Sequence, residues 1–163
     1  MNANYAILVG IVAVLVVARF LSGPTQEVAS AAPHPAGKHK VSAAEVVLQR
    51  ASNGHFLVDA EINGTDIRML ADTGASYVTL GEDAAESIGL DPDSLDYTEG
   101  AHTANGVVAV AIVELDEIRV GSIVRRDVRA MVTRGLKGGL LGMSFFNTLS
   151  KVSIESDELV LKD

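Results

Sequence analysis

The sequence predicts a mostly β domain with two short helices, folded as a closed barrel or a sandwich. Two observations lead to this prediction. Short runs of apolar and β-branched residues alternate with polar residues, which is the pattern of half-buried strands. Turn-forming pairs separate neighbouring runs, namely Asn63-Gly64, Gly121-Ser122 and Ser156-Asp157. We find no internal repeat, so we expect one domain.

The N-terminal 21 residues form a separate unit. The run "YAILVGIVAVLVVARFL" (5–21) is almost wholly apolar, and as a helix it would span about 25 Å, the short end of what a bilayer requires. A cleavable signal peptide is the rival interpretation, because Ala29-Ser30-Ala31 has the A-x-A form. The start "MNAN" lacks a basic residue, and that site lies far beyond the apolar run. The sequence therefore favours an uncleaved transmembrane anchor over residues 1–21.

The rest of the chain divides into a linker and a folded domain. Residues 22–44 hold three of the four prolines and many small residues, so this segment cannot bury enough surface to order itself. We interpret it as a flexible linker. Residues 45–163 form the domain, which retains 20 of the 21 acidic and 10 of the 13 basic side chains, a net charge of −10. This acidity argues against a nucleic-acid partner.

Cysteine and histidine usage bears on metal sites. The chain has no cysteine, so neither disulfides nor a cysteine–zinc site can support the fold. Of the four histidines, His34 and His39 have a metal-like spacing, but they lie among prolines in the predicted linker. His55 and His102 complete no ligand pattern with them. We expect no metal and no cofactor.

The first half of the domain contains an expected hairpin and a helix. In "HFLVDAEI" (55–62) apolar residues fall on one face, and Asp59 and Glu61 fall on the other. Asn63-Gly64 turns the chain into "TDIRMLA" (65–71), and "YVTL" (77–80) is the next expected strand. Residues 81–89 are expected to form a short helix, because acidic residues occupy its first turn and a glycine ends it.

The second half contains longer strands. Residues 107–120 and 123–133 read as strands, with a bulge near Asp116-Glu117 that would restore the apolar alternation. The segment "GLLG" (139–142) leads into a short helix in "MSFFNTLS", with Met143, Phe146 and Leu149 spaced for one face. The last 13 residues read as a hairpin.

The stretch "LADTGAS" (70–76) is the strongest candidate for chemistry. It places Asp72 between an apolar strand and a turn of small residues, where a rigid backbone can orient the carboxylate as a general base. A second carboxylate nearby would let the pair share one proton, so that an acid and a base coexist. The alternative is an Asx-turn. Phosphoryl-transfer aspartate motifs also contain D-T-G, but the D-K-T-G form and a phosphate loop are absent here.

Two motifs together extend the interpretation. "MLADTGAS" is followed about 70 residues later by "GGLLGMSFFNTL", and this combination resembles the retropepsin-like aspartic proteases over residues 45–163. The anchor and single lobe look closest to bacterial, inner-membrane-tethered members. The resemblance implies a closed β-barrel lobe and a homodimer in which each copy contributes one Asp72. It also implies direct attack of water on a peptide carbonyl, with no covalent intermediate, metal or cofactor.

The resemblance assigns roles to further residues. Asp72 would bind the catalytic water, and Thr73 would make the hydrogen bonds that lock the two loops together. Gly74 would permit close approach, and Ser76 would bond the outer carboxylate oxygen. Retroviral members carry an Arg, which supports an ion pair, where this sequence has Met143. Asp59, the other candidate acid in the same chain, lies in an alternating strand and is expected to face solvent.

The family also has a flap, a hairpin that closes over substrate. Residues 97–108 occupy the corresponding place, with a tip at Thr103, Ala104, Asn105 and Gly106. An ordinary exposed hairpin fits the same residues equally well. His102 and Tyr97 are therefore candidate substrate contacts and no more.

We therefore expect a membrane-tethered homodimeric aspartic endopeptidase that acts on polypeptides in or near its membrane. The main alternative is a catalytically silent β-domain that binds peptides or dimerises, and a surface-anchored structural domain is a third. The resemblance points to a periplasmic domain on the bacterial inner membrane. The positive-inside rule points the other way, because Arg19, Lys38 and Lys40 all follow the span.

Overall fold

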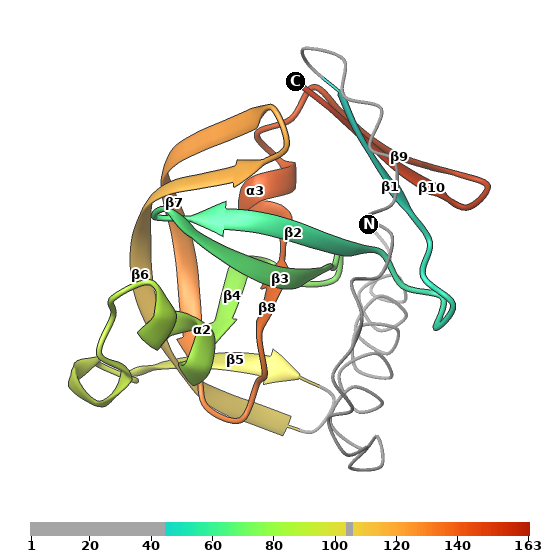
Figure 1. Cartoon of the computed structure of the whole chain (residues 1–163). Helices are drawn as coiled ribbons and strands as arrows, with labels where there is room; N and C mark the ends of the chain where they lie inside the picture. Colours follow the sequence, from blue (N-terminus) through green and yellow to red (C-terminus); the bar gives the residue numbers. More distant parts are fainter. Residues whose placement is uncertain (1–44, 104–105) are drawn as a thin grey trace, which may run out of the picture.

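The computed structural model describes residues 45–103 and 106–163 (Figure 1). The predicted transmembrane anchor (1–21), the predicted linker (22–44) and two residues of the predicted flap tip, Ala104 and Asn105, lie outside the described residues. Within the described ranges, no helix is both long enough and apolar enough to cross a bilayer.

A closed barrel of six strands forms the body of the domain (Figure 1). The strand order is β2-β3-β8-β4-β7-β6, and β2 pairs with β6 at Ile62 and Ile118, which closes the ring. A seventh strand, β5, pairs with the first part of β6. The bounds are β2 (Leu57–Ile62), β3 (Thr65–Ala71), β4 (Val78–Gly81), β5 (Glu99–Thr103), β6 (Gly106–Val120), β7 (Ile123–Thr133) and β8 (Gly139–Leu141). The predicted mostly β closed barrel is confirmed.

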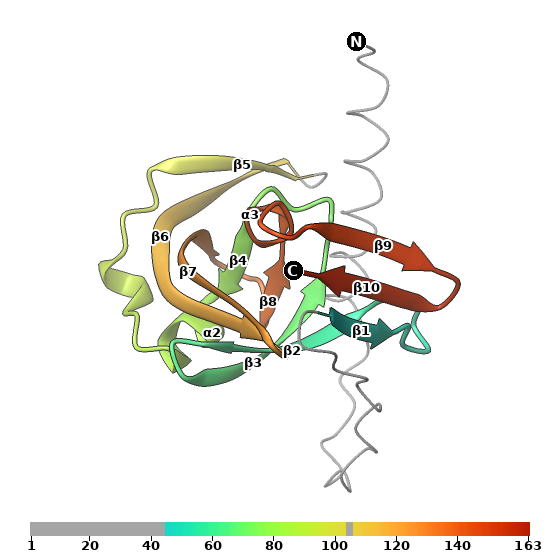
Figure 2. The same cartoon turned by 90° about the horizontal axis from the view of Figure 1, so that it is seen from above.

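A second, antiparallel sheet lies beside the barrel (Figure 2). Its three strands have the order β1 (Glu45–Gln49), β10 (Glu158–Lys162) and β9 (Lys151–Glu155). The β9–β10 pair is the predicted terminal hairpin, with its turn at Ser156-Asp157. Strand β1 was not predicted, because it is short and pairs with residues at the other end of the domain.

Two short α-helices and one 3₁₀ turn complete the fold: α2 (Glu82–Ser87), η1 (Pro92–Ser94) and α3 (Met143–Phe146). Helix α2 agrees with the prediction, and Gly89, with a φ of 88°, turns the chain after it. The second helix is shorter than predicted, because it ends at Phe146 and Leu149 of the expected apolar face lies beyond it. Helix α3 is a single turn, and Phe145 is fully buried beside Phe146, with their rings edge-on at 6.1 Å.

The core follows the predicted alternation. Val58, Ala60 and Ile62 on β2 are at most 1% exposed, whereas Asp59 between them is exposed and pairs with Arg68 at 2.9 Å. Asp59 therefore faces solvent, as expected. Burying these apolar side chains is the main stabilising contribution of the barrel, at roughly 25 cal/mol per Å² of apolar surface.

The β6–β7 ribbon changes its buried face halfway along. Leu115 and Ile118 are both fully buried, although strict alternation would place them on opposite faces. The predicted bulge is wrong in its form. Leu115 pairs with Val128 and Glu117 with Arg126, so neither strand gains a residue across the break. Asp127 instead adopts a φ of 52° at the break in the β6–β7 pairing, and beyond this break Ile118 and Arg119 of β6 pair with β2.

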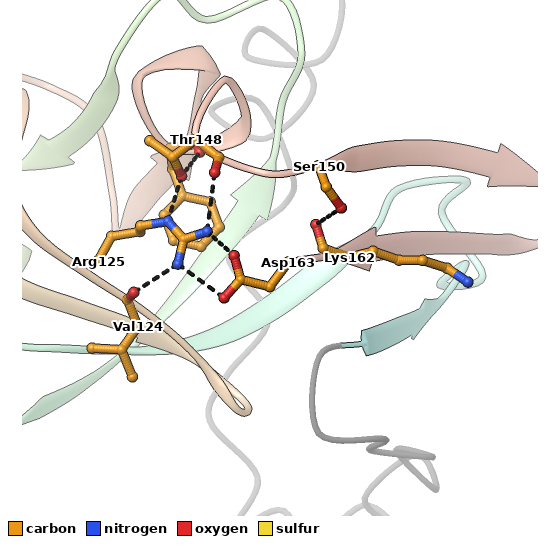
Figure 3. A network of polar contacts seen from close by, with 7 residues as sticks. Val124, Arg125, Thr148, Ser150, Lys162 and Asp163 are labelled. Carbon is orange, nitrogen blue, oxygen red and sulfur yellow. Dashed lines mark hydrogen bonds and ion pairs between the residues drawn. The ribbon is translucent and has the colours of Figure 1, made fainter.

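A polar network holds the C-terminal end against the barrel (Figure 3). Arg125, at the start of β7, donates from Nε to Thr148 Oγ1 at 2.8 Å and from Nη2 to the Thr148 carbonyl at 3.0 Å. The same guanidinium pairs with the carboxylate of Asp163. The hydrogen bond from Arg125 holds the pKa of Asp163 below its usual value. The network therefore fixes the segment after α3 relative to β7 and the chain end.

Candidate active site

Two parallel strands bring the two sequence motifs together. Strand β3 leads into Asp72 and β8 leads into Gly142, and these strands pair in parallel with Ala71 opposite Leu141. Both motifs therefore emerge at the same edge of the barrel. The backbone N–H of Asp72 donates to the carbonyl oxygen of Leu141 at 3.0 Å, which continues the ladder into the loop. The candidate site is thus built on rigid strand ends.

The Asp72 loop is a tight turn closed by its own carboxylate. The N–H of Gly74 donates to Asp72 Oδ1 at 2.8 Å, and the N–H of Ala75 donates to the Asp72 carbonyl at 3.2 Å. Asp72 is half-buried, whereas Thr73, Gly74 and Ser76 are exposed. Among the described residues, the hydrogen bond to the carboxylate comes from Gly74 and not from Ser76. The assigned roles of Thr73 and Ser76 remain predictions.

Gly142 allows the segment that follows β8 to pass very close to the backbone that follows Asp72. A Cβ at this position would lie 2.1 Å from the carbonyl oxygen of Tyr77 and 2.8 Å from that of Ala75, so only glycine fits. Immediately after it, the N–H of Met143 donates to the Ala75 carbonyl at 2.8 Å. The Ser144 hydroxyl accepts the N–H of Val78 at 2.8 Å. The start of α3 therefore braces the strand that leaves the Asp72 loop.

Ser144 is a supporting residue that was not predicted from the sequence. It lies in the first turn after the apolar-apolar-glycine motif, and this placement is the signal that could have identified it. Met143, at the position where retroviral members carry an Arg, also has a clear structural place. Its side chain packs against the core, so an apolar contact occupies the place where retroviral members carry a charge.

The environment of Asp72 favours its protonated form. Burial raises the pKa of Asp72 above its ordinary value, because a charged carboxylate loses hydration there. The N–H of Gly74, which bonds the carboxylate directly, the nearby N–H of Ala75 and the charge of His55 partly oppose this rise in pKa. A carboxylate that is easily protonated but held by backbone donors suits acid–base chemistry. Within the described ranges, no three histidine or carboxylate side chains gather as metal ligands.

A groove of about 530 Å³ opens beside the Asp72 loop. Its lining combines the loop, α3 and β9: Thr73, Met143, Phe146, Asn147, Leu149, Ser150, Lys151 and Val152. The groove therefore borders the exposed side of the loop, where Thr73 projects beyond the barrel.

The predicted flap is the β5–β6 hairpin. Thr103 pairs with Gly106, and the Thr103 hydroxyl donates to the Gly106 carbonyl at 2.8 Å. His102 is exposed opposite Val107, which is 63% exposed. Tyr97 is different, because its hydroxyl is buried and Arg134 lies 4.8 Å above its ring. Of the two candidate substrate contacts, only His102 is available on the hairpin surface.

Comparison with known proteins agrees with this geometry. The aspartyl protease family matches residues 58–145. An uncharacterised protein from the cobV 5′ region of a Sinorhizobium species is 49% identical over 121 residues, covering 73% of this chain and 52% of the relative. An uncharacterised protein of Rickettsia prowazekii is 32% identical over 78% of this chain and 55% of the relative. The chain thus spans about half the length of the curated relatives it matches.

Two solved structures share the fold. The retropepsin-like aspartic protease from Rickettsia conorii superimposes with a TM-score of 0.66 at 32% identity, over 72% of this chain and 98% of that one. EIAV protease, in complex with the inhibitor HBY-793, matches with a TM-score of 0.51 at 18% identity, over 61% of this chain and 91% of that one. The second match concerns the fold alone. The family match and the structure from Rickettsia conorii agree with the Asp72 loop at the strand end and with the close approach at Gly142. The chain therefore belongs to the retropepsin-like aspartyl proteases.

Proposed function

We propose that the protein is an aspartic endopeptidase whose active site is completed by two Asp72 carboxylates of a homodimer. The observation that carries this proposal is the half-buried, backbone-bonded Asp72 at the barrel edge, with its pKa raised by burial. The family membership supports peptide hydrolysis as the reaction. One chain supplies one such carboxylate, so the site as described is half of the expected pair.

The chemistry follows from one proton shared between two carboxylates. Two like charges at close range cannot both be ionised at mild pH, so one Asp72 is protonated and its counterpart is not. The ionised carboxylate removes a proton from water as that water attacks the peptide carbonyl, and the protonated carboxylate donates to the carbonyl oxygen. Collapse of the tetrahedral intermediate passes a proton to the leaving amine. The N–H of Gly74 holds the carboxylate in place during these steps.

The groove beside the Asp72 loop supports the proposal that the protein forms a dimer. Thr73 and Gly74 are exposed at the edge of the barrel, and the groove beside them is lined partly by apolar side chains of α3 and β9. A second copy placed across a two-fold axis would cover these residues. Each domain carries a net charge of −10, so two copies repel within a Debye length, about 8 Å at physiological salt. Confinement to one membrane would raise their effective concentration.

We place the protein on the bacterial inner membrane, with residues 5–21 as anchor, 22–44 as tether and the domain in the periplasm. A tethered site meets polypeptides in or near the same membrane, so these are the proposed substrates. Protease added to spheroplasts should digest residues 45–163. Full protection of the domain would place it in the cytoplasm, as the charge bias around the span suggests.

The proposed activity is tested by incubating the 163-residue chain with a diverse peptide library. Asp72→Asn should lower the cleavage rate at least about 100-fold, because it removes the acid–base group and keeps the shape. Asp59→Asn is the matched control, since Asp59 is exposed on β2 and should leave activity unchanged. Cleavage by Asp72→Asn at the wild-type rate would disprove the assignment. Absence of cleavage by the wild type would favour the catalytically silent module.

A further inference from the structure

His55 is a titratable residue that the proposed mechanism leaves unused, and the strand register places it beside Asp72. The antiparallel β2–β3 register continues past the strand ends, since the N–H of Ala71 donates to the Phe56 carbonyl at 2.9 Å. One further step in the same register sets His55 opposite Asp72. The Ala71–Phe56 bond ties the residue before Asp72 to the residue after His55, so a continued register would bring the two side chains to the non-hydrogen-bonded position, where opposed side chains lie closest.

The backbone of His55 is held in a tight hairpin. Its carbonyl accepts the N–H of Ala51 at 2.7 Å, and its own N–H donates to Asn53 Oδ1 at 3.2 Å. Arg50 closes the hairpin by donating to the Gly54 carbonyl at 3.0 Å. The His55 side chain is half-buried, and within the described part of the chain its imidazole makes no hydrogen bond. The backbone thus fixes the position of His55, and among the described residues neither ring nitrogen has a hydrogen-bond partner.

The charged groups on the elements next to His55 in the described structure are Asp72, Arg50 and Asp157. Asp72 lies opposite it, Arg50 lies on its own hairpin, and Asp157 lies on the β9–β10 turn. Arg50 and Asp157 pair with each other at 3.1 Å, so their charges largely cancel. The remaining pair is His55 with Asp72, and the charge of His55 indeed lowers the pKa of the Asp72 carboxyl against the effect of burial.

We propose that His55 is a positioning residue for catalysis, whose protonated imidazole stabilises the ionised Asp72 carboxylate and extends proteolysis to lower pH. This inference rests on the proposed function of Asp72. Histidine side chains are in general cationic in mildly acidic solution, where a positive imidazole favours the ionised form of a nearby carboxyl group. Activity falls on the acid side when the second carboxylate of the pair takes a proton. A cation opposite each Asp72 resists that step.

The test compares two substitutions at this position in the 163-residue chain. His55→Gln removes the charge and keeps a polar side chain, whereas His55→Lys keeps a positive charge. The measured quantity is the pH profile of kcat/KM. His55→Gln should move the midpoint of the acid limb up by about half a pH unit, and His55→Lys should keep the wild-type midpoint. A purely structural role would lower activity equally at every pH.

The carboxyl ¹³C signal of Asp72 gives a second readout that needs no catalysis. Its titration midpoint should rise in His55→Gln and stay in place in His55→Lys. If His55→Gln fails to fold, His55→Asn provides the same loss of charge. Superimposable wild-type and neutral-variant titrations, or equal shifts for the Lys and neutral variants, would overturn the proposal. Failure of the proposed function is a different result, namely a wild type that cleaves no peptide or an active Asp72→Asn.

Discussion

The backbone N–H of Asp72 and the carbonyl oxygen of Leu141 are joined by a hydrogen bond of 3.0 Å at the end of the parallel β3–β8 pair. Residues from the two ends of the barrel sequence are thereby locked into one site. This strand pairing and the N–H of Gly74 together fix the position of the Asp72 carboxylate. Substitutions at residues 139–142 should therefore alter the chemistry of Asp72.

Gly142→Ala tests this dependence. An added Cβ would lie 2.1 Å from the Tyr77 carbonyl, so the loop must move, and we expect a loss of about 1–3 kcal/mol in the free energy of unfolding together with most of the activity. Urea denaturation and peptide cleavage measure the two effects. Gly64→Ala is the control: its φ of 83° makes alanine strained, but the surrounding space is open and the turn is far along β2–β3 from the site. It should be destabilised by about 1 kcal/mol and remain active.

The elements that could be predicted from the sequence are the local ones. The β2–β3 hairpin follows from its own alternation and from Asn63-Gly64, and α2 follows from its acidic first turn and Gly89. Strands β1 and β8 were not predicted, because each is short and is stabilised by partners distant in sequence. The positive φ of Asp127 was not predicted either, because aspartate is not a residue that requires this conformation.

In the candidate site, too, the residues within a local motif were predicted and the residues brought in by the fold were not. Asp72 and Gly74 belong to a contiguous motif with a chemical rationale, so the sequence identifies them directly. Ser144 and His55 reach the site only through a helix start and a strand register. His55 has no local pattern that distinguishes it from an ordinary surface residue, and Ser144 is marked only by its place after the apolar-apolar-glycine motif.

The raised pKa of Asp72 predicts a change in stability for Asp72→Asn. The pKa is higher in the folded chain than in the unfolded one, so the stabilising contribution is complete below the unfolded value, near 3.9, and is lost as pH rises through the folded value. Ionised Asp72 therefore destabilises the fold at neutral pH. Asp72→Asn should increase the free energy of unfolding at pH 7 and have little effect at pH 3, measured by urea denaturation under monomeric conditions. Equal stability of both proteins at pH 7 would contradict the burial of this carboxyl group.

Arg125→Ala should loosen the segment that follows α3. The substitution leaves the Thr148 carbonyl and hydroxyl without the guanidinium, and we expect a loss of about 1–3 kcal/mol in the free energy of unfolding. Arg126→Ala is the matched control, because Arg126 is 71% exposed and pairs with Glu117 on the surface. It should change stability by less than about 1 kcal/mol. Equal losses for both variants would show that the Arg125 network adds nothing beyond a surface ion pair.

The central claim is that two chains share one active site, and mixing wild type with Asp72→Asn tests it most directly. Wild-type chain in detergent is held at a concentration where activity per chain no longer rises, and a ninefold excess of Asp72→Asn is added. Random pairing leaves about one tenth of the wild-type chains in fully wild-type dimers, so cleavage should fall to about one tenth. The same excess of an inert protein should have no effect. Unchanged activity per wild-type chain would mean that one chain holds a complete site and would contradict the shared pair of Asp72 carboxylates.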